Sequence, residues 1–323
     1  MSKTTTYLLK TLQKATGNQI LLPFYHAVTD TNLGFTDQLY PPRSIADFKN
    51  DLEVLLQFYK PISLATLIKI NKTKSKPKQA YFHLTFDDGL ANFYHEVAPI
   101  LKEKNIPATV FLNTDFIDNK ALFFRYKASL LLKKYKNSDA NTKQVFEQFS
   151  REKKAQNVKD YLLAVRYQNK TALDKLAQEV NYSFTTYLAE EKPYLSLAQI
   201  KELQTQNITF GTHSTDHPFF ADLSLEEQLK QVTESSEWIK KNLQLDYKAF
   251  SFPFEDAGVS REFFTKADLD ISFGTYGIKK DIIPNNLQRI SFEYADRNTG
   301  LFLLKEHFKF LLKIPLRKHL IKR

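Results

Sequence analysis

Two adjacent carboxylates at the end of an apolar run are the first candidates for chemistry. Asp87 and Asp88 follow the run Leu84–Phe86 and are themselves followed by Gly89. Side chains alternate between the two faces of a strand, but a glycine turn at the strand end lets both carboxylates approach one point. Taken alone, Asp-Asp-Gly is most often simply a turn. The pair becomes informative only if other ligands lie near it.

A pair of histidines follows another predicted strand, Ile208–Thr212. His213 and His217 are separated by Ser-Thr-Asp, and Pro218 comes next, so we expect a loop in which solvated rings are the default. In α/β chains, however, sites form where the carboxyl ends of parallel strands meet. Two imidazoles and one carboxylate can hold a divalent metal and leave positions for water and substrate. A second carboxylate can then take a proton from the water, so the pattern indicates metal-dependent hydrolysis.

Both segments resemble motifs of one family. Thr85–Gly89 and His213–Pro218 look like the first and second motifs of the polysaccharide deacetylases (NodB homology domain, carbohydrate esterase family 4). The resemblance implies a divalent metal held by Asp88, His213 and His217, with Asp87 as the general base. Zinc is the first expectation for this ligand set, and iron, cobalt, nickel and manganese are alternatives.

The third motif departs from the family. The family usually has Arg-x-Pro-Tyr where this chain has Ser251-Phe252-Pro253-Phe254. The resemblance implies that the backbone N–H of Phe254 helps to hold the oxyanion, which does not depend on the side chain. The family arginine normally pairs with the base carboxylate, and Ser251 cannot do so. Either another group orients Asp87, or the protein is slow or inactive.

Protonation of the leaving amine requires an acid that titrates near neutrality, usually a histidine. The family's last motif places one after a late strand, but the late strand here, Leu287–Phe292, has none. The early run Gln19–Tyr25 ends in His26 and resembles the opening strand of circularly permuted relatives that deacetylate poly-N-acetylglucosamine. The resemblance therefore makes His26 the candidate acid. Of the other histidines, we expect His83 to be packed in the barrel and His307 to be solvated.

Short apolar runs alternate with helical patterns along the chain. The helices expected after Ser44, Ser196 and Ser224 each begin with a capping-box pattern. The expected strands are Ile20–Tyr25, Tyr81–Phe86, Ala108–Leu112, Ile208–Thr212, Lys248–Phe252, Asp270–Thr275 and Leu287–Phe292. This order predicts an α/β chain, and it matches the distorted (β/α)7 barrel that the NodB resemblance implies.

We expect one deacetylase-like barrel domain over residues 1–323. Residues 119–193 carry helical periodicity without a convincing strand, and are predicted to be a helical insertion within that domain. An insertion after a barrel strand can form a wall or lid of the substrate cleft, or it can be a packing subdomain; the two readings weigh equally. Residues 300–323 form a basic amphipathic C-terminal tail.

Composition narrows the class of protein. The chain has 323 residues and no cysteine, which excludes disulfides and thiolate metal sites. Its N-terminus lacks an apolar signal-peptide core and a cleavage site, and no run is long enough to span a membrane. These features lead us to expect a cytoplasmic protein.

Charge is concentrated in the tail. The chain has a net charge of +10, and residues 300–323 contain seven Lys or Arg against Glu306. The tail's apolar and basic helix faces could dock on an anionic membrane surface. The favoured alternative is a terminal helix packed on the barrel with a solvated basic end. Nucleic-acid binding is not expected, because no known module surrounds the charge.

The expected function is removal of acetyl groups from an N-acetylated sugar in a polysaccharide, glycolipid or surface-glycan precursor. Two alternatives remain open at this stage. One is a related hydrolase that acts on another acyl group or a cyclic amide. The other is a catalytically silent glycan-binding or assembly protein on the same scaffold, which the serine at position 251 keeps in consideration.

Overall fold

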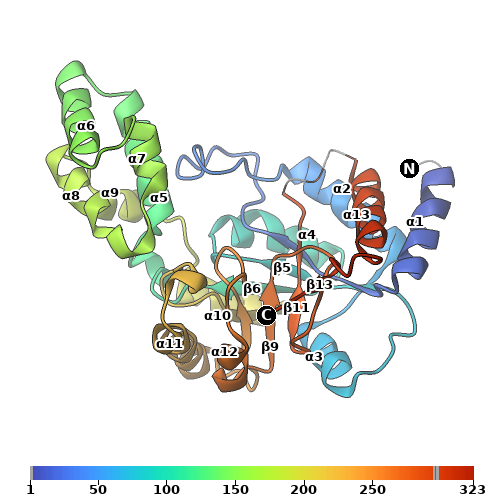
Figure 1. Ribbon diagram of the computed structural model, residues 1–323. Helices are drawn as coiled ribbons and strands as arrows, with labels where there is room; N and C mark the ends of the chain where they lie inside the picture. Colours follow the sequence, from blue (N-terminus) through green and yellow to red (C-terminus); the bar gives the residue numbers. More distant parts are fainter. Residues whose placement is uncertain (1–2, 294, 296–297) are drawn as a thin grey trace.

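The computed structural model describes residues 3–293, 295 and 298–323, and its centre is a parallel barrel with helices outside it (Figure 1). The strands of the main sheet lie in the order β11-β9-β8-β7-β6-β5-β2-β12, and every pairing is parallel. Their bounds are β2 Pro23–Tyr25, β5 Leu84–Phe86, β6 Ala108–Leu112, β7 Ile208–Thr212, β8 Ala249–Ser251, β9 Ile271–Gly274, β11 Asn286–Gln288 and β12 Ile290–Ser291. The prediction of an α/β barrel is confirmed.

One segment joins the two edges of this sheet. β11 pairs with β9 and β12 pairs with β2, although only Arg289 separates β11 from β12. The N–H of Arg289 donates to the Gly274 carbonyl (3.0 Å), whereas the N–H of Ile290 donates to the Leu22 carbonyl (2.9 Å). The consecutive residues Arg289 and Ile290 therefore form hydrogen bonds to the two opposite edges of the main sheet. The main sheet is nearly closed by seven segments of chain.

Each of the seven expected strands contains an observed strand, but three of them are interrupted. The breaks fall at Leu22, His83 and Arg289, where the chain changes its pairing partner. The first halves of two of these strands, β1 Ile20–Leu21 and β4 Tyr81–Phe82, form a small extra sheet with β3 Lys60–Pro61. A separate pair is formed by β10 Lys280–Asp281 and β13 Leu320–Ile321. His83 is fully buried between the Ile62 carbonyl and the Thr109 hydroxyl, so the expectation of a packed histidine is confirmed.

The helices surround the barrel and extend from it. They are α1 Lys3–Thr16, α2 Ile45–Phe58, α3 Leu64–Thr73, α4 Ala98–Glu103, α5 Phe124–Lys136, α6 Ala140–Glu152, α7 Val158–Ala164, α8 Thr171–Glu179, α9 Phe184–Glu191, α10 Leu197–Gln204, α11 Leu225–Leu243, α12 Arg261–Lys266 and α13 Thr299–Lys313. Short π or 3-10 turns occupy Phe93–Val97, Ile117–Asn119, Tyr167–Asn169 and Phe220–Asp222. Ser196 and Ser224 form complete capping boxes. At Ser44 the box is incomplete, because the Asp47 carboxylate accepts from the Ser44 hydroxyl instead of its backbone N–H.

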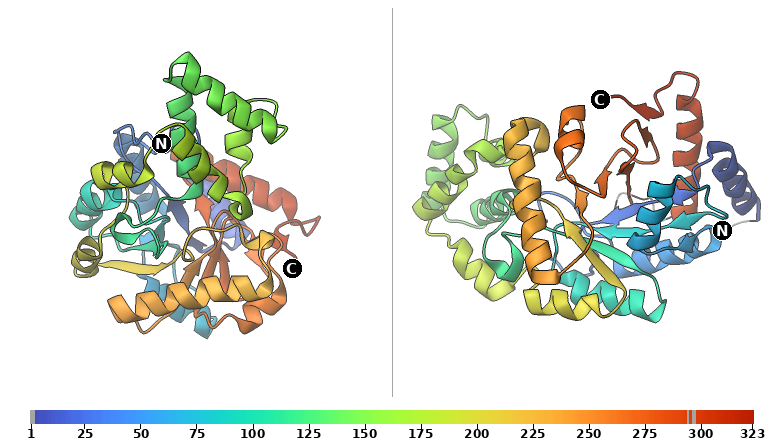
Figure 2. Two further views of the ribbon diagram at one scale, coloured as in Figure 1. Left: turned by 90° about the vertical axis from the view of Figure 1, so that its left-hand side faces the viewer. Right: turned by 90° about the horizontal axis from the view of Figure 1, so that it is seen from below.

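Helices α5 to α9 follow β6 and precede β7 in the sequence, and they extend outward from the barrel (Figures 1 and 2, green). They share an apolar cluster that includes Leu131, Phe146, Leu162 and Leu173, all buried. The same cluster contains Ala27 and Leu90 from the barrel loops, so the helices are anchored at the end of the barrel where β2 and β5 finish. The division of the chain at residues 119–193 remains a prediction.

Helices α1 and α13 pack together on the side of the barrel away from this extension (Figure 1). α13 buries Leu303, His307 and Phe310. His307 lies 3.2 Å from both the Thr16 hydroxyl and the Tyr59 hydroxyl, and its burial lowers its pKa to about 4. The expectation of a solvated His307 was wrong, because the helix turns this ring toward its neighbours. No helix within the described residues is long and apolar enough to cross a membrane.

Candidate active site

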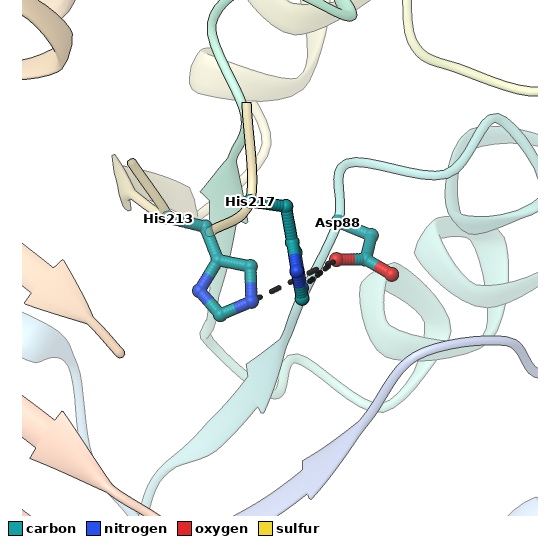
Figure 3. A group of neighbouring side chains, drawn as sticks. All are labelled: Asp88, His213 and His217. Atoms are coloured by element: carbon teal, nitrogen blue, oxygen red, sulfur yellow. Dashed lines mark ion pairs between the residues drawn. The ribbon is translucent and has the colours of Figure 1, made fainter. Parts of the chain in front are cut away.

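The two motifs meet where the barrel strands end. Asp88 follows β5, and His213 and His217 follow β7; all three are buried, and their ligand atoms lie within 4.8 Å of one another (Figure 3). The Asp88 Oδ1 atom is 3.2 Å from His217 Nε2 and 3.7 Å from His213 Nε2. The structure therefore brings together the three residues predicted as metal ligands.

The backbone at these residues is unusual. Asp88 has a φ of 69° and His217 a φ of 64°, both in the left-handed region that residues other than glycine rarely adopt. Gly89 continues the turn with a φ of 63°. Such conformations cost free energy and concentrate at functional sites. Here they occur at two of the three clustered residues, at positions just beyond strands β5 and β7.

The protonation state of the cluster suits a cation. The Nδ1 atom of His213 lies 2.8 Å from the Ser251 carbonyl, and because a carbonyl only accepts, Nδ1 carries the proton and Nε2 has a free lone pair. Burial lowers the pKa of His213 to about 4, so the ring is neutral at pH 7. Burial alone would raise the pKa of Asp88, but His217 lowers it below the usual range.

Two atoms at the centre of the cluster lack hydrogen-bond partners among the described residues. They are His213 Nε2 and Asp88 Oδ1, both buried. The other carboxylate oxygen of Asp88 accepts from the Tyr126 hydroxyl (2.7 Å), which fixes its orientation. Buried polar atoms without partners are costly. A neutral imidazole and a carboxylate that face one another in this state fit a divalent metal ion.

Asp87, the neighbour of Asp88, lines the same cavity and forms a buried ion pair with Arg289. The Arg289 Nη1 and Nη2 atoms donate to the two Asp87 oxygens at 2.7 Å each, and neither side chain is more than 2% exposed. Burial would raise the pKa of Asp87, but the guanidinium lowers it below its usual value. The carboxylate is therefore ionised at neutral pH.

Arg289 supplies the guanidinium partner of Asp87 that Ser251 cannot provide. Its Nη2 also donates to the Ser251 hydroxyl (2.6 Å), so the guanidinium lies beside the position where the family has its arginine. It is sandwiched between the rings of Phe24 and Phe111 inside the barrel. Sequence reasoning placed Arg289 in a late strand but assigned it no role. The available signal was a lone charged residue within a predicted strand, Leu287–Phe292.

His26 follows β2 and is held by a second acid that sequence reasoning missed. Glu293, two residues beyond β12, accepts from the His26 backbone N–H (2.7 Å) and from its Nδ1 (2.9 Å). Burial favours the neutral ring, but the Glu293 carboxylate overcomes this and raises the pKa of His26 to about 10. The ring is therefore protonated at neutral pH, and the bond at Nδ1 leaves Nε2 available to a substrate.

One cavity of about 260 Å³ connects these groups. Asp87, Asp88, His217 and His26 line it together with residues from the helical extension, including Phe123, Arg125 and Tyr126. It is smaller than the roughly 300 to 1,000 Å³ that encloses a drug-sized ligand, so it would enclose only part of a larger substrate.

Phe254 forms another wall of this cavity. Its ring contacts that of His217, with 4.8 Å between the centroids, and its φ is 58°. Within the described residues, no group accepts a hydrogen bond from its backbone N–H. An available backbone N–H beside the metal-ligand cluster is a donor that an oxyanion contact requires.

Comparison with known proteins gives consistent results. A family model described as polysaccharide deacetylase matches residues 74–152 and 164–265, more than half of the chain. The solved deacetylase PplD of Streptococcus pyogenes, in complex with acetate, superposes with a TM-score of 0.57 and 16% identity, covering 88% of this chain and 97% of that one.

Two further structures are similar in fold. IcaB from Ammonifex degensii has a TM-score of 0.55 and 13% identity over 90% of this chain and 97% of its own. BC0361, a polysaccharide deacetylase from Bacillus cereus, has a TM-score of 0.54 and 14% identity over 88% of this chain and 68% of its own. No curated protein matches the chain in sequence.

Proposed function

The chain belongs to the polysaccharide deacetylase family, whose members hydrolyse N-acetyl amide bonds, and we propose that it does so with the residues that meet in this cavity. Its substrate is an N-acetylated sugar of a polysaccharide, glycolipid or surface-glycan precursor. The observation that carries the proposal is the cluster of buried, unpartnered ligand atoms beside an ionised Asp87.

Asp88, His213 and His217 would hold a divalent metal, zinc being the first expectation. When bound, such an ion polarises the acetyl carbonyl and lowers the pKa of water. Asp87 accepts the proton of the attacking water, for which its carboxylate must be ionised. Arg289 keeps it ionised and fixes both oxygens.

Two further groups act on the acetyl amide. The backbone N–H of Phe254 donates to the oxygen that becomes negative as the carbonyl is attacked. His26, protonated and oriented by Glu293, donates a proton from Nε2 to the amine nitrogen as the C–N bond breaks. The products are acetate and a free amino sugar.

The direct test is acetate release by metal-reconstituted protein from N-acetylated chito-oligomers and from a bacterial surface-glycan extract. We expect release by the native protein and loss of about 10²- to 10⁴-fold in Asp87→Asn and in His26→Ala, as for general base and acid groups. An undiminished rate in His26→Ala would refute its acid role. Faster turnover of a generic acetyl ester or cyclic amide would favour a different acyl substrate, and glycan binding without turnover would favour a silent scaffold.

Glu293 sets the pH range over which His26 is an acid. Glu293→Gln removes the charge that raises the pKa of His26, and the remaining burial lowers it. The alkaline limb of the kcat/KM profile should therefore move to lower pH. Glu262→Gln, a change at an exposed carboxylate that pairs with Lys266, is the matched control and should leave the profile in place. An unmoved alkaline limb in Glu293→Gln would contradict the assignment of His26.

Arg125 is a cation in the cavity without an acidic partner among the described residues. Its guanidinium stacks on Phe124 and Phe254, and it donates to the Leu163 carbonyl. Charge-assisted hydrogen bonds contribute about 1.5 to 3 kcal/mol, so Arg125→Met should raise KM about 10- to 150-fold for glycans with a carboxylate or phosphate next to the acetylated sugar. KM for neutral chito-oligomers should hardly change.

Steady-state kinetics on paired neutral and anionic substrates measure this difference. Arg166→Met is the matched control, since Arg166 is exposed and lies outside this cavity. An equal rise of KM for both kinds of substrate in Arg125→Met would show that Arg125 only shapes the cavity.

A further inference from the structure

Almost all of the chain's net charge lies in two segments that pack on each other. Residues 3–16 contain three lysines and no carboxylate, and residues 299–323 contain seven Lys or Arg against Glu306. Together they carry +9 of the net +10, which leaves residues 17–298 nearly neutral. α1 and α13, which these segments form, lie side by side at one end of the molecule (Figures 1 and 2). Of these cations, Arg323 is neutralised within the protein, because it forms ion pairs with Asp256 and Asp281.

The same region exposes most of the large apolar side chains that face solvent. Among the described residues, eleven such side chains are exposed, and eight of them lie in residues 7–8 and 301–320. The most exposed are Tyr7 (71%), Leu316 (67%), Leu312 (61%) and Phe308 (55%). Isolated exposed apolar residues are ordinary, but a group of them is a sign of an interaction surface.

The helix geometry of α13 explains this exposure. Leu303, His307 and Phe310 face α1 and the barrel, so the core of the helix contact is already complete. Leu301, Phe308 and Leu312 follow one another at intervals of seven and four residues and therefore share the opposite face. α13 therefore has one apolar face that is buried and a second apolar stripe that faces solvent.

The same two helices and the turn after α13 also carry exposed cations. We define the terminal surface as the exposed apolar residues Tyr7, Leu8, Leu301, Phe308, Leu312 and Leu316 together with the cations Lys10, Lys14, Lys309, Lys313, Arg317 and Lys318. Glu306 is the one carboxylate in the two segments, and it pairs with Lys309. The terminal surface therefore combines exposed apolar side chains with a large excess of positive charge.

We propose that the terminal surface docks the protein on an anionic lipid bilayer. Apolar side chains of the stripe insert at the boundary between headgroups and acyl chains, while the surrounding lysines and arginines lie among anionic headgroups. This combination distinguishes a bilayer from a nucleic acid, which offers phosphates but no apolar layer to cover Phe308, Leu312 and Leu316. The proposal does not depend on the reaction in the cavity. It would bring the enzyme to lipid-linked or surface glycans.

Co-sedimentation of the full chain with vesicles tests the proposal. We expect binding to vesicles that contain phosphatidylglycerol, weaker binding to phosphatidylcholine vesicles, and loss of binding as ionic strength rises. Each basic residue near anionic headgroups contributes about a fivefold change in partition, so the triple variant Lys313→Gln, Arg317→Gln, Lys318→Gln should bind about 100-fold more weakly. Phe308→Ser with Leu312→Ser should also release the protein, including at low salt.

Matched controls separate docking from folding. Leu56→Ser with Ile282→Ser removes two exposed apolar side chains outside the terminal surface and should bind vesicles as the native protein does. Circular dichroism and acetate release should be unchanged in all these variants. Equal binding to neutral and anionic vesicles, native binding by the triple variant, or binding to a nucleic-acid duplex without binding to vesicles would each overturn the proposal.

Discussion

Arg289→Met should sharply lower acetate release, to a residual rate that is still measurable, and destabilise the fold, the largest effect that we expect from a single substitution. The change leaves the Asp87 carboxylate, 2% exposed, without its guanidinium partner. Removing one member of a buried ion pair costs about 3 to 5 kcal/mol of the free energy of unfolding. Loss of a positioned base lowers the rate by about 10²- to 10⁴-fold. Chemical denaturation and acetate release measure the two effects.

The pH dependence separates positioning from mere stability. In the native protein Arg289 lowers the pKa of Asp87, so the pair stabilises the fold at neutral pH, and that contribution is lost as the pH falls through the lowered pKa. Arg289→Met removes the strongest influence that opposes burial, so the pKa of Asp87 should rise and the acid limb of kcat/KM should move to higher pH. An unmoved acid limb would show that Asp87 is not the base.

A matched control and a rescue sharpen this test. Arg43 forms a similar buried pair with Asp51 outside the cavity, so Arg43→Met should destabilise the protein without moving the acid limb. The double change Ser251→Arg with Arg289→Ser transfers the guanidinium to the position used by the family. Because Ser251 Oγ is 2.6 Å from Arg289 Nη2, we expect this variant to recover part of the rate lost in Arg289→Ser.

Removal of the proposed metal should eliminate acetate release and lower the melting temperature, the second large effect. A bound ion that favours the folded state adds its binding free energy to stability, and its absence leaves His213 Nε2 and Asp88 Oδ1 without partners. Chelation followed by zinc addition should abolish and then restore both properties. Asp88→Asn should weaken metal binding more than about 100-fold, which exceeds the effect of changing a group that only supports a ligand.

Two further variants calibrate the metal prediction. Tyr126→Phe removes the hydrogen bond to Asp88 and should lower metal affinity by about 10- to 100-fold. Asp216→Asn changes a carboxylate that lies between the two histidines in sequence but is bonded to Tyr167, Lys170 and Gln231. It should retain native metal content in elemental analysis. Native metal content in Asp88→Asn would contradict the assignment.

Local patterns in the sequence were sufficient for the seven strands, the helix starts at Ser196 and Ser224, and the pairing of His213 with His217, whereas the grouping of Asp88 with these histidines rested on the resemblance to the family motifs. Each of these local patterns depends on residues a few positions apart: alternation along a strand, a serine three residues before its partner, or three residues between two histidines. The parallel arrangement then places strand ends, and the side chains after them, at one end of the barrel.

The partners of Asp87 and His26 were decided by the tertiary structure. Arg289 is 202 residues from Asp87, and Glu293 is 267 residues from His26. Both contacts depend on the closing segment, whose two halves pair with β9 and β2 and so bring the last strand beside the first. No short-range pattern encodes that closure. The missing family arginine therefore looked like a loss in the sequence, although the barrel supplies the same guanidinium from a strand that is distant in sequence and adjacent in space.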